Sequence, residues 1–167
     1  MKKTIAALLV FILSAVVITG CKKTQDKKVE AKKSPGSIEL TDLNGKKNKL
    51  KILTNGKPVM ISFFASWCAI CIKEVEENNK IYKKYKNSGL LVYGINVGED
   101  KKSAMQFIKK YKVEYPVFVD KDETAAKSVG MIGLPLNIIY DGDFEEVFRD
   151  AVPPTDDLLK RITGAKK

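Results

Sequence analysis

Residues 59–71 read VMISFFASWCAIC, and this stretch carries most of the information about the fold. Its first half is a nearly unbroken apolar run, which predicts a buried β-strand over residues 59–64. Two cysteines, Cys68 and Cys71, follow the run with two residues between them. Residues 69–86 then show helical periodicity, so the cysteine pair is expected where a buried strand leads into a helix.

This position favours redox chemistry at Cys68. A thiolate is the nucleophile of thiol–disulfide exchange, and the free N–H groups and the dipole at a helix start stabilise an anion. Cys71 lies one helical turn further on, within reach of a disulfide. We therefore expect Cys68 to form the mixed disulfide with a partner and the more buried Cys71 to resolve it. The alternative is a static Cys68–Cys71 crosslink, although a loop that short stabilises a fold weakly.

The composition excludes several other kinds of chemistry. The chain has 167 residues, three cysteines and no histidine, so it lacks the commonest general base and the commonest metal ligand. A zinc site would have to use carboxylates. We predict no metal site, and no cofactor other than the redox-active disulfide between Cys68 and Cys71. The length suits one domain with appendages.

Residues 1–20 are interpreted as a lipoprotein signal peptide. Lys2 and Lys3 precede an apolar stretch, residues 5–18, that is too short to be interpreted as a membrane span. Residues 18–21, Ile-Thr-Gly-Cys, resemble a bacterial lipobox, in which the cysteine receives the lipid. That resemblance makes Cys21 the predicted lipidation site. The alternative is a cleaved signal or an uncleaved anchor in which Cys21 has no role.

Residues 21–36 are interpreted as the lipidated cysteine and a basic, flexible tether. Residues 22–36 contain six lysines, two acidic residues and no aromatic residue, a composition that cannot form a core. The lysines either favour anionic lipid headgroups or form a solvated spacer. The tether contributes +4 to the formal net charge of +10, and Lys2 and Lys3 contribute +2. The remaining +4 is too little to indicate nucleic acid binding.

Residues 37–167 are predicted to form one α/β domain. We expect strands at residues 37–42, 49–53, 59–64, 90–97, 116–120, 136–140 and 144–148, and helices at 69–86, 101–112, 123–129 and 153–162. Asn44-Gly45 marks a turn, so the first two strands should form an N-terminal β-hairpin. Alternating strands and helices indicate a parallel sheet core, to which a hairpin turning at Asp141-Gly142 adds antiparallel strands.

The segment around the cysteines resembles the active site of a known family. Residues 63–74, FFASWCAICIKE, are similar to those of thioredoxin-fold proteins, specifically the membrane-anchored TlpA/ResA-like thiol–disulfide oxidoreductases. Further matches follow in that family's order: Asn96-Val97 with Glu99-Asp100, Tyr115-Pro116-Val117 with Asp120, Gly133-Leu134-Pro135, and Tyr140-Asp141-Gly142. The resemblance covers about residues 37–162. It implies a thioredoxin-like fold, with a mixed central sheet flanked by helices.

Glu74 is the third candidate catalytic residue. At 100° per residue, it falls between the apolar residues Ile81 and Tyr85 on the expected helix, so it should point to the core below the cysteines. A carboxyl group in apolar surroundings has a raised pKa and can exchange a proton near neutral pH. The family resemblance implies the same role, so we expect Glu74 to accept or relay the Cys71 proton. The alternative is an acid at the rim that stabilises the helix start.

Four residues are expected to contact the substrate. Leu134-Pro135 matches the family's X-cis-Pro, a turn that exposes the backbone before the proline to an incoming peptide. The alternative is an ordinary trans proline that opens a strand. Trp67 and Ile70 flank the cysteines and could form an apolar landing surface, although Trp67 could equally have a packing role.

The sequence departs from relatives at two points near the cysteines. Ser62 stands where thioredoxins usually carry a buried Asp, so no proton-transfer role is transferred to it, and its hydroxyl is expected to make a local hydrogen bond. The Ala69-Ile70 spacer differs from the frequent x-Pro dipeptide. The direction of electron flow therefore does not follow from the spacer.

Together these features predict a lipid-anchored protein of the bacterial cell membrane, with its domain facing the extracytoplasmic side. The resemblance implies that it reduces disulfides in exported proteins, possible substrates including apocytochrome c, and that a membrane protein supplies the electrons. The alternatives are a thiol oxidase with the same residues, a thiol peroxidase, and a non-enzymatic binding or metal-delivery module. The PxxxTxxC context of peroxiredoxins and the histidine of metal carriers are both absent. We expect a monomer that binds no nucleic acid.

Overall fold

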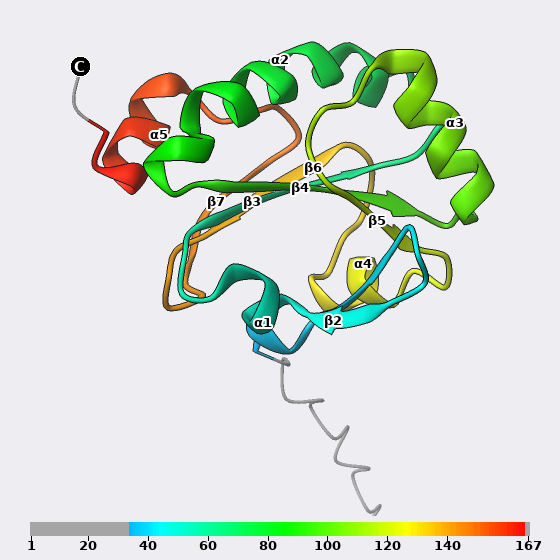
Figure 1. Cartoon of the computed structure of the whole chain (residues 1–167), viewed down its shortest axis with the longest axis horizontal. Coiled ribbons are helices and arrows are strands. Elements are labelled where there is room, and N and C mark those ends of the chain that lie inside the picture. The colour runs from blue at the N-terminus through cyan, green and yellow to red at the C-terminus, as the bar shows by residue number, and fades with distance from the viewer. Residues whose placement is uncertain (1–33, 166–167) are drawn as a thin grey trace, which may run out of the picture. The chain divides into compact units, whose positions relative to one another are not determined.

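The computed structural model describes residues 34–165. The predicted signal peptide, Cys21 and most of the predicted tether lie outside the described residues. Within them, a central sheet carries helices on both of its faces (Figure 1). Among residues 34–165, no helix has both the length and the apolar character needed to cross a membrane.

The sheet is mixed and has seven strands in the order β2-β1-β5-β4-β3-β6-β7. The strands are β1 (Glu39–Asp42), β2 (Lys47–Lys49), β3 (Val59–Phe64), β4 (Leu91–Val97), β5 (Val117–Asp120), β6 (Leu136–Tyr140) and β7 (Glu146–Asp150). Strands β3, β4 and β5 are parallel. The β1–β2 hairpin pairs antiparallel with β5, and β6 and β7 extend the other edge antiparallel to β3. The predicted thioredoxin-like mixed sheet and its N-terminal hairpin are confirmed.

The longer helices lie on one face of the sheet. They are α2 (Ala69–Tyr85), α3 (Lys101–Tyr111) and α5 (Asp156–Thr163), whereas the short helices α1 (Leu50–Thr54) and α4 (Thr124–Ser128) lie on the other face (Figure 1). Two single-turn 3₁₀ helices, Pro35–Ser37 and Lys86–Ser88, complete the elements. All six residues of β3 are buried, because helices cover both faces of this central strand.

Successive side chains of β3 enter two separate core clusters. Ile61 and Phe63 pack in the cluster on the α1 and α4 face, while Met60 and Phe64 pack with α2 and α3. The two cysteines belong to the second cluster. Because side chains alternate between the two faces of a strand, Phe64 packs in the same core cluster as Cys68 and Cys71.

The strand predicted over residues 49–53 is wrong. Strand β2 ends at Lys49, and residues 50–54 form helix α1, in which Leu50 is fully buried. Leu50 and Leu53 are three residues apart, a spacing that fits one helical turn and is ambiguous in so short a segment. The helix ends at Asn55, which adopts the left-handed conformation with φ of 47°, a common way to stop a helix.

Several boundaries also differ from the sequence prediction, and Phe144 is involved in two of them. The β7 strand begins at Glu146, two residues late, because Phe144 has a φ of 67° and belongs to the turn. The Phe144 ring packs on Gly36, where a Cβ would lie 3.2 Å from two ring carbons. Gly36 is buried, so the packed domain includes the last residues of the predicted tether.

Candidate active site

Cys68 and Cys71 form a disulfide at the junction of β3 and α2. Cys68 is the N-cap residue of α2, and its sulfur accepts a hydrogen bond from the Cys71 N–H at 3.2 Å. This places the Cys68 sulfur beside the free N–H groups of the helix start, as the sequence predicted. The side chains are 7% and 4% exposed, so the difference in burial between them is small.

Glu74 lies one turn after Cys71 and is buried, with 8% of its surface exposed. Its Oε2 accepts a hydrogen bond from Asn137 Nδ2 of β6 at 3.2 Å. Burial raises the pKa of Glu74, and the Asn137 hydrogen bond opposes this shift to a smaller extent. The predicted inward orientation is confirmed, and its role as a proton relay stays a prediction.

Further buried polar side chains lie between α2, β3 and β6. Ser62 of β3 accepts a hydrogen bond from Asn78 Nδ2 of α2 at 3.2 Å, which confirms the expected local hydrogen bond. Asn137 lies directly opposite Ser62 in the antiparallel β3–β6 pair. The pKa of the buried Tyr115 is raised to about 12, mainly by burial; a hydrogen bond with Asn78 opposes this shift, and the charge of Glu74 adds to it. Sequence reasoning missed the contact of Asn137 with Glu74. The two residues are 63 positions apart, and Asn137 reaches Glu74 only because β6 pairs with β3 in this register.

The Leu134-Pro135 bond is cis, as the family resemblance implied. Leu134 packs against both core clusters, including the one that contains the cysteines, and Pro135 leads directly into β6. This arrangement brings the loop before β6 next to the disulfide layer. The substrate-binding role of the two residues stays a prediction.

Apolar side chains beside the disulfide are exposed. Trp67 and Ile70 have 73% and 58% of their surface exposed, so Trp67 has no packing role in this state. Ile132, two residues before Leu134, is fully exposed as well. It was missed, since a single apolar residue in a loop gives no signal of its own in the sequence. The substrate-binding role of Trp67 and Ile70 stays a prediction.

Glu99 connects the end of β4 to the loop that carries Cys68. Its Oε2 accepts hydrogen bonds from the Ser66 N–H and from Asn96 Nδ2, both at 2.7 Å, and the Ser66 hydroxyl donates to its Oε1. The sequence placed Glu99 among the family's matching residues without a role. Its contact with Ser66 spans 33 positions in the chain, so sequence spacing could not reveal it.

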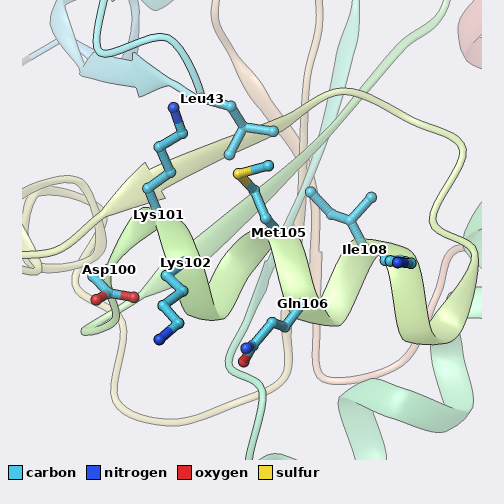
Figure 2. A pocket seen from close by; sticks show the side chains of 8 residues that line it. Leu43, Asp100, Lys101, Lys102, Met105, Gln106 and Ile108 are labelled. Atoms are coloured by element: carbon cyan, nitrogen blue, oxygen red, sulfur yellow. The ribbon is translucent and has the colours of Figure 1, made fainter.

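A groove lies on α3 and not over the disulfide. This groove has a volume of about 760 Å³ and is lined by Leu43, Asp100, Lys101, Lys102, Met105, Gln106, Ile108 and Lys109 (Figure 2). Met105 is half exposed and points into it, because the buried face of α3 consists of Ala104 and Phe107. None of residues 65–71, which form the turn and the start of α2, is among the residues that line the groove.

Among residues 34–165, no three or more His, Cys, Asp or Glu side chains are grouped so that they could hold a metal ion. Tyr115 packs in the same core cluster as the cysteines, Glu74 is buried one turn after Cys71, and Glu99 binds Ser66 in the turn before Cys68. The chemistry available at the site is therefore exchange between the Cys68–Cys71 disulfide and external thiols.

A thioredoxin-like fold with a cysteine pair at the start of α2 and a cis proline beside it defines a thiol–disulfide oxidoreductase. Comparison with known proteins gives the family. Residues 31–145 match the AhpC/TSA family, and the chain belongs to this family.

Individual relatives agree with this assignment. The chain is similar to the thiol–disulfide oxidoreductase ResA of Bacillus thuringiensis subsp. konkukian, with 35% identity over 144 residues, covering 84% of this chain and 83% of the relative. ResA of Bacillus cereus is 34% identical over the same shares. Among solved structures, a secreted Mycobacterium tuberculosis disulfide oxidoreductase homologous to E. coli DsbE has a TM-score of 0.66. It is 20% identical and covers 80% of this chain and 99% of its own, so it supports the fold alone.

Proposed function

We propose that this thiol–disulfide oxidoreductase reduces disulfides in exported proteins while tethered to the extracytoplasmic side of a bacterial cell membrane. The observation that carries the proposal is the Cys68–Cys71 disulfide at the start of α2, with the buried Glu74 one turn below it. The exposed Trp67 and Ile70 provide a surface on which a partner could dock. The similarity to ResA proteins supports the same chemistry.

The reductive reaction has two exchange steps. In the reduced enzyme, the Cys68 thiolate attacks one sulfur of the substrate disulfide, so that a mixed disulfide forms and the other substrate sulfur leaves as a thiolate and takes up a proton. Cys71 then attacks the Cys68 sulfur, the second substrate thiol leaves, and two electrons have passed to the substrate. Glu74 accepts the proton that Cys71 must lose before its attack. A membrane electron-donor protein then reduces the Cys68–Cys71 disulfide again.

The location belongs to the same proposal. Residues 1–20 act as the signal peptide, Cys21 carries the lipid, and residues 22–36 link it to the domain. The support is the resemblance of residues 18–21 to a lipobox and the basic composition of the residues that follow. The family resemblance further suggests apocytochrome c as a substrate, because its haem-binding cysteines must be reduced before ligation.

A trapping experiment tests the function. In the full chain, Cys71→Ser removes the resolving thiol, so substrates stay disulfide-bonded to Cys68 and can be identified by mass spectrometry. The matched control is the double variant Cys68→Ser/Cys71→Ser, which has no thiol at the active site. Cytochrome precursors on Cys68 would support the narrow substrate proposal, and a broad set of exported proteins would indicate a general reductase. Absence of any adduct that depends on Cys68 would contradict the proposal.

The direction of electron flow has its own readout. A reductase is kept mainly as the dithiol in cells by its electron donor, whereas an oxidase is kept mainly as the disulfide. Acid quenching followed by thiol alkylation and mass measurement gives the ratio of the two forms. A mostly oxidised Cys68–Cys71 pair would favour the oxidase alternative.

A further inference from the structure

Glu99, which follows β4, accepts hydrogen bonds from the turn that carries Cys68. The Cys68 N–H donates to the Ala65 carbonyl at 3.1 Å, which closes a four-residue turn with Ser66 in its second position. Glu99 binds this corner twice, through the Ser66 N–H at 2.7 Å and through the Ser66 hydroxyl. The turn is the whole connection between β3 and α2, so its conformation determines where the Cys68 sulfur lies.

Glu99 is itself fixed to the sheet. Asn96 donates to Glu99 Oε2 at 2.7 Å and is fully buried in β4. Asn96 also lies opposite Phe64, the last residue of β3, in the parallel ladder. The contacts therefore form a closed path from the end of β3 across β4 to Glu99 and back to Ser66. Glu99 and Ser66 are half-buried, where such charge-assisted hydrogen bonds are stronger than in bulk water.

We propose that Glu99 is a positioning residue of the exchange reaction: it holds the Cys68 turn in place, and its negative charge limits the fraction of Cys68 that is thiolate. An anion near a thiol favours the protonated form. It therefore opposes the start of α2, which favours the thiolate. The inference depends on the exchange chemistry of Cys68 and not on the identity of the substrate or the membrane.

Other groups near Cys68 must be separated from Glu99 in any test. Cys71 and Glu74 lie on α2, and Tyr115 precedes β5 in the same core layer. Residues 131–135 of the cis-proline loop carry no titratable side chain, and Asp100, Lys101 and Lys102 begin α3 beyond Glu99. Variants that change only Glu99 or Ser66 leave all of these groups in place.

Two substitutions separate the charge of Glu99 from its hydrogen bonds. In Glu99→Gln, the amide oxygen can accept from the Ser66 N–H and from Asn96, while the amide N–H₂ donates to the Ser66 hydroxyl, which then acts as an acceptor. The contacts are kept and the charge is lost. Ser66→Ala keeps the charge and removes one of the three hydrogen bonds. The matched control Glu76→Gln removes one charge from the exposed side of α2.

The charge is tested by the pH profile of Cys68 alkylation. The reduced full chain is treated with iodoacetamide between pH 5 and 10, and the rate at the Cys68 peptide is followed by mass spectrometry. We expect Glu99→Gln to move the midpoint down by roughly 0.5 to 1 pH unit, and Ser66→Ala and Glu76→Gln to leave it unchanged. A Glu99→Gln profile that coincides with the wild type, or that moves upward, would overturn the role of the charge.

The positioning role is tested above both midpoints, where Cys68 is fully ionised in every variant. The rate of reduction of glutathione disulfide is measured there. We expect Glu99→Ala to be about tenfold slower, because a misplaced nucleophile loses orientation, Glu99→Gln to recover most of the rate, and Ser66→Ala to lose about twofold. If Glu99→Ala does not fold, the Ser66→Ala rate alone tests the positioning role. Rates equal to the wild type in these variants would overturn the positioning role.

Discussion

Glu74 differs from a surface carboxyl group in two ways. Its side chain is buried, and the hydrogen bond that it accepts comes from a neutral side-chain amide. Asn137 supplies a single hydrogen bond at 3.2 Å, which does not compensate for the lost solvation, so the pKa stays raised. A carboxyl group in this state can be protonated at a pH where surface carboxyl groups are ionised. This makes Glu74 suited to take the proton from Cys71.

We predict that Glu74→Gln slows the resolution of mixed disulfides by about 10- to 100-fold near neutral pH, since the amide cannot accept the Cys71 proton. The measurement is rapid-quench kinetics of product release from a preformed Cys68 mixed disulfide. Glu77→Gln, on the exposed side of the same helix, is the matched control and should keep the wild-type rate. A Glu74→Gln rate within twofold of the wild type would contradict the relay.

The raised pKa also makes the folding stability depend on pH. The unfolded chain loses the Glu74 proton near the ordinary value of 4.5, whereas the native state keeps it to a higher pH. The native state then binds more protons, so this contribution to stability is complete below 4.5 and is lost as the pH rises through the raised pKa. We predict that oxidised wild type loses stability relative to Glu74→Gln between pH 4 and pH 7, measured by urea unfolding. A difference that stays constant with pH would contradict the shift.

At the residue scale, the sequence could predict only what local geometry determines. The inward direction of Glu74 follows from helical periodicity, and the placement of Cys68 follows from its position at the helix start. The partners Asn137 and Glu99 reach the site through strand register and loop packing. Local propensities contain no information on either contact.

At the scale of elements, prediction succeeded where the hydrophobic pattern was long. Strand β3 matches its predicted range, and α2 ends one residue before the predicted end. A run of six apolar or buried positions and a helical pattern over 17 residues each allow only one interpretation. Helix α1 was missed because five residues cannot distinguish a period of two from a period of 3.6. The start of β7 was displaced by a turn whose Asp141 side chain accepts hydrogen bonds from the N–H groups of Asp143 and Glu145.

Gly94 shows how closely β4 packs on the active-site layer. A Cβ at this position would lie 2.9 Å from the Tyr115 ring and 3.0 Å from the Phe64 ring. We predict that Gly94→Ala lowers the free energy of unfolding by about 1–3 kcal/mol, since neither ring can move freely in a packed core. Gly133→Ala is the control, because a Cβ there meets no atom within 4 Å. Equal urea unfolding midpoints for Gly94→Ala and Gly133→Ala would contradict this prediction, because they would show that the two rings can move to make room for the added methyl group.

At the scale of the whole molecule, the order of the strands is the property that the sequence did not provide. The β1–β2 hairpin joins the sheet beside β5, although the chain passes through β3 and β4 in between. Only long-range pairing, Thr41 with Val119 and Asp42 with Phe118, determines that position. The presence of helices on both faces of the sheet, in contrast, follows from the alternation of strands and helices along the chain.

The last prediction concerns how the whole protein is held at the membrane. If Cys21 carries the lipid, Cys21→Ser in the full chain should abolish incorporation of labelled fatty acid and leave the protein unprocessed at its signal peptide. Exchange activity towards a soluble disulfide should stay at the wild-type level, because the domain that contains Cys68 and Cys71 is unchanged. The measurements are fatty-acid labelling, the mass of the N-terminal peptide and fractionation of cells.

Washing conditions then distinguish the possible attachments of wild type and Cys21→Ser. Acyl chains hold the wild type through alkaline carbonate and through 1 M salt, because apolar burial is not screened. Release of the wild type by salt alone would instead assign the attachment to the lysines at residues 22–33, whose attraction to anionic headgroups is screened. Fatty-acid labelling that persists in Cys21→Ser would contradict lipidation at this residue, and a wild type that resists carbonate but carries no fatty acid would identify residues 5–18 as an uncleaved anchor.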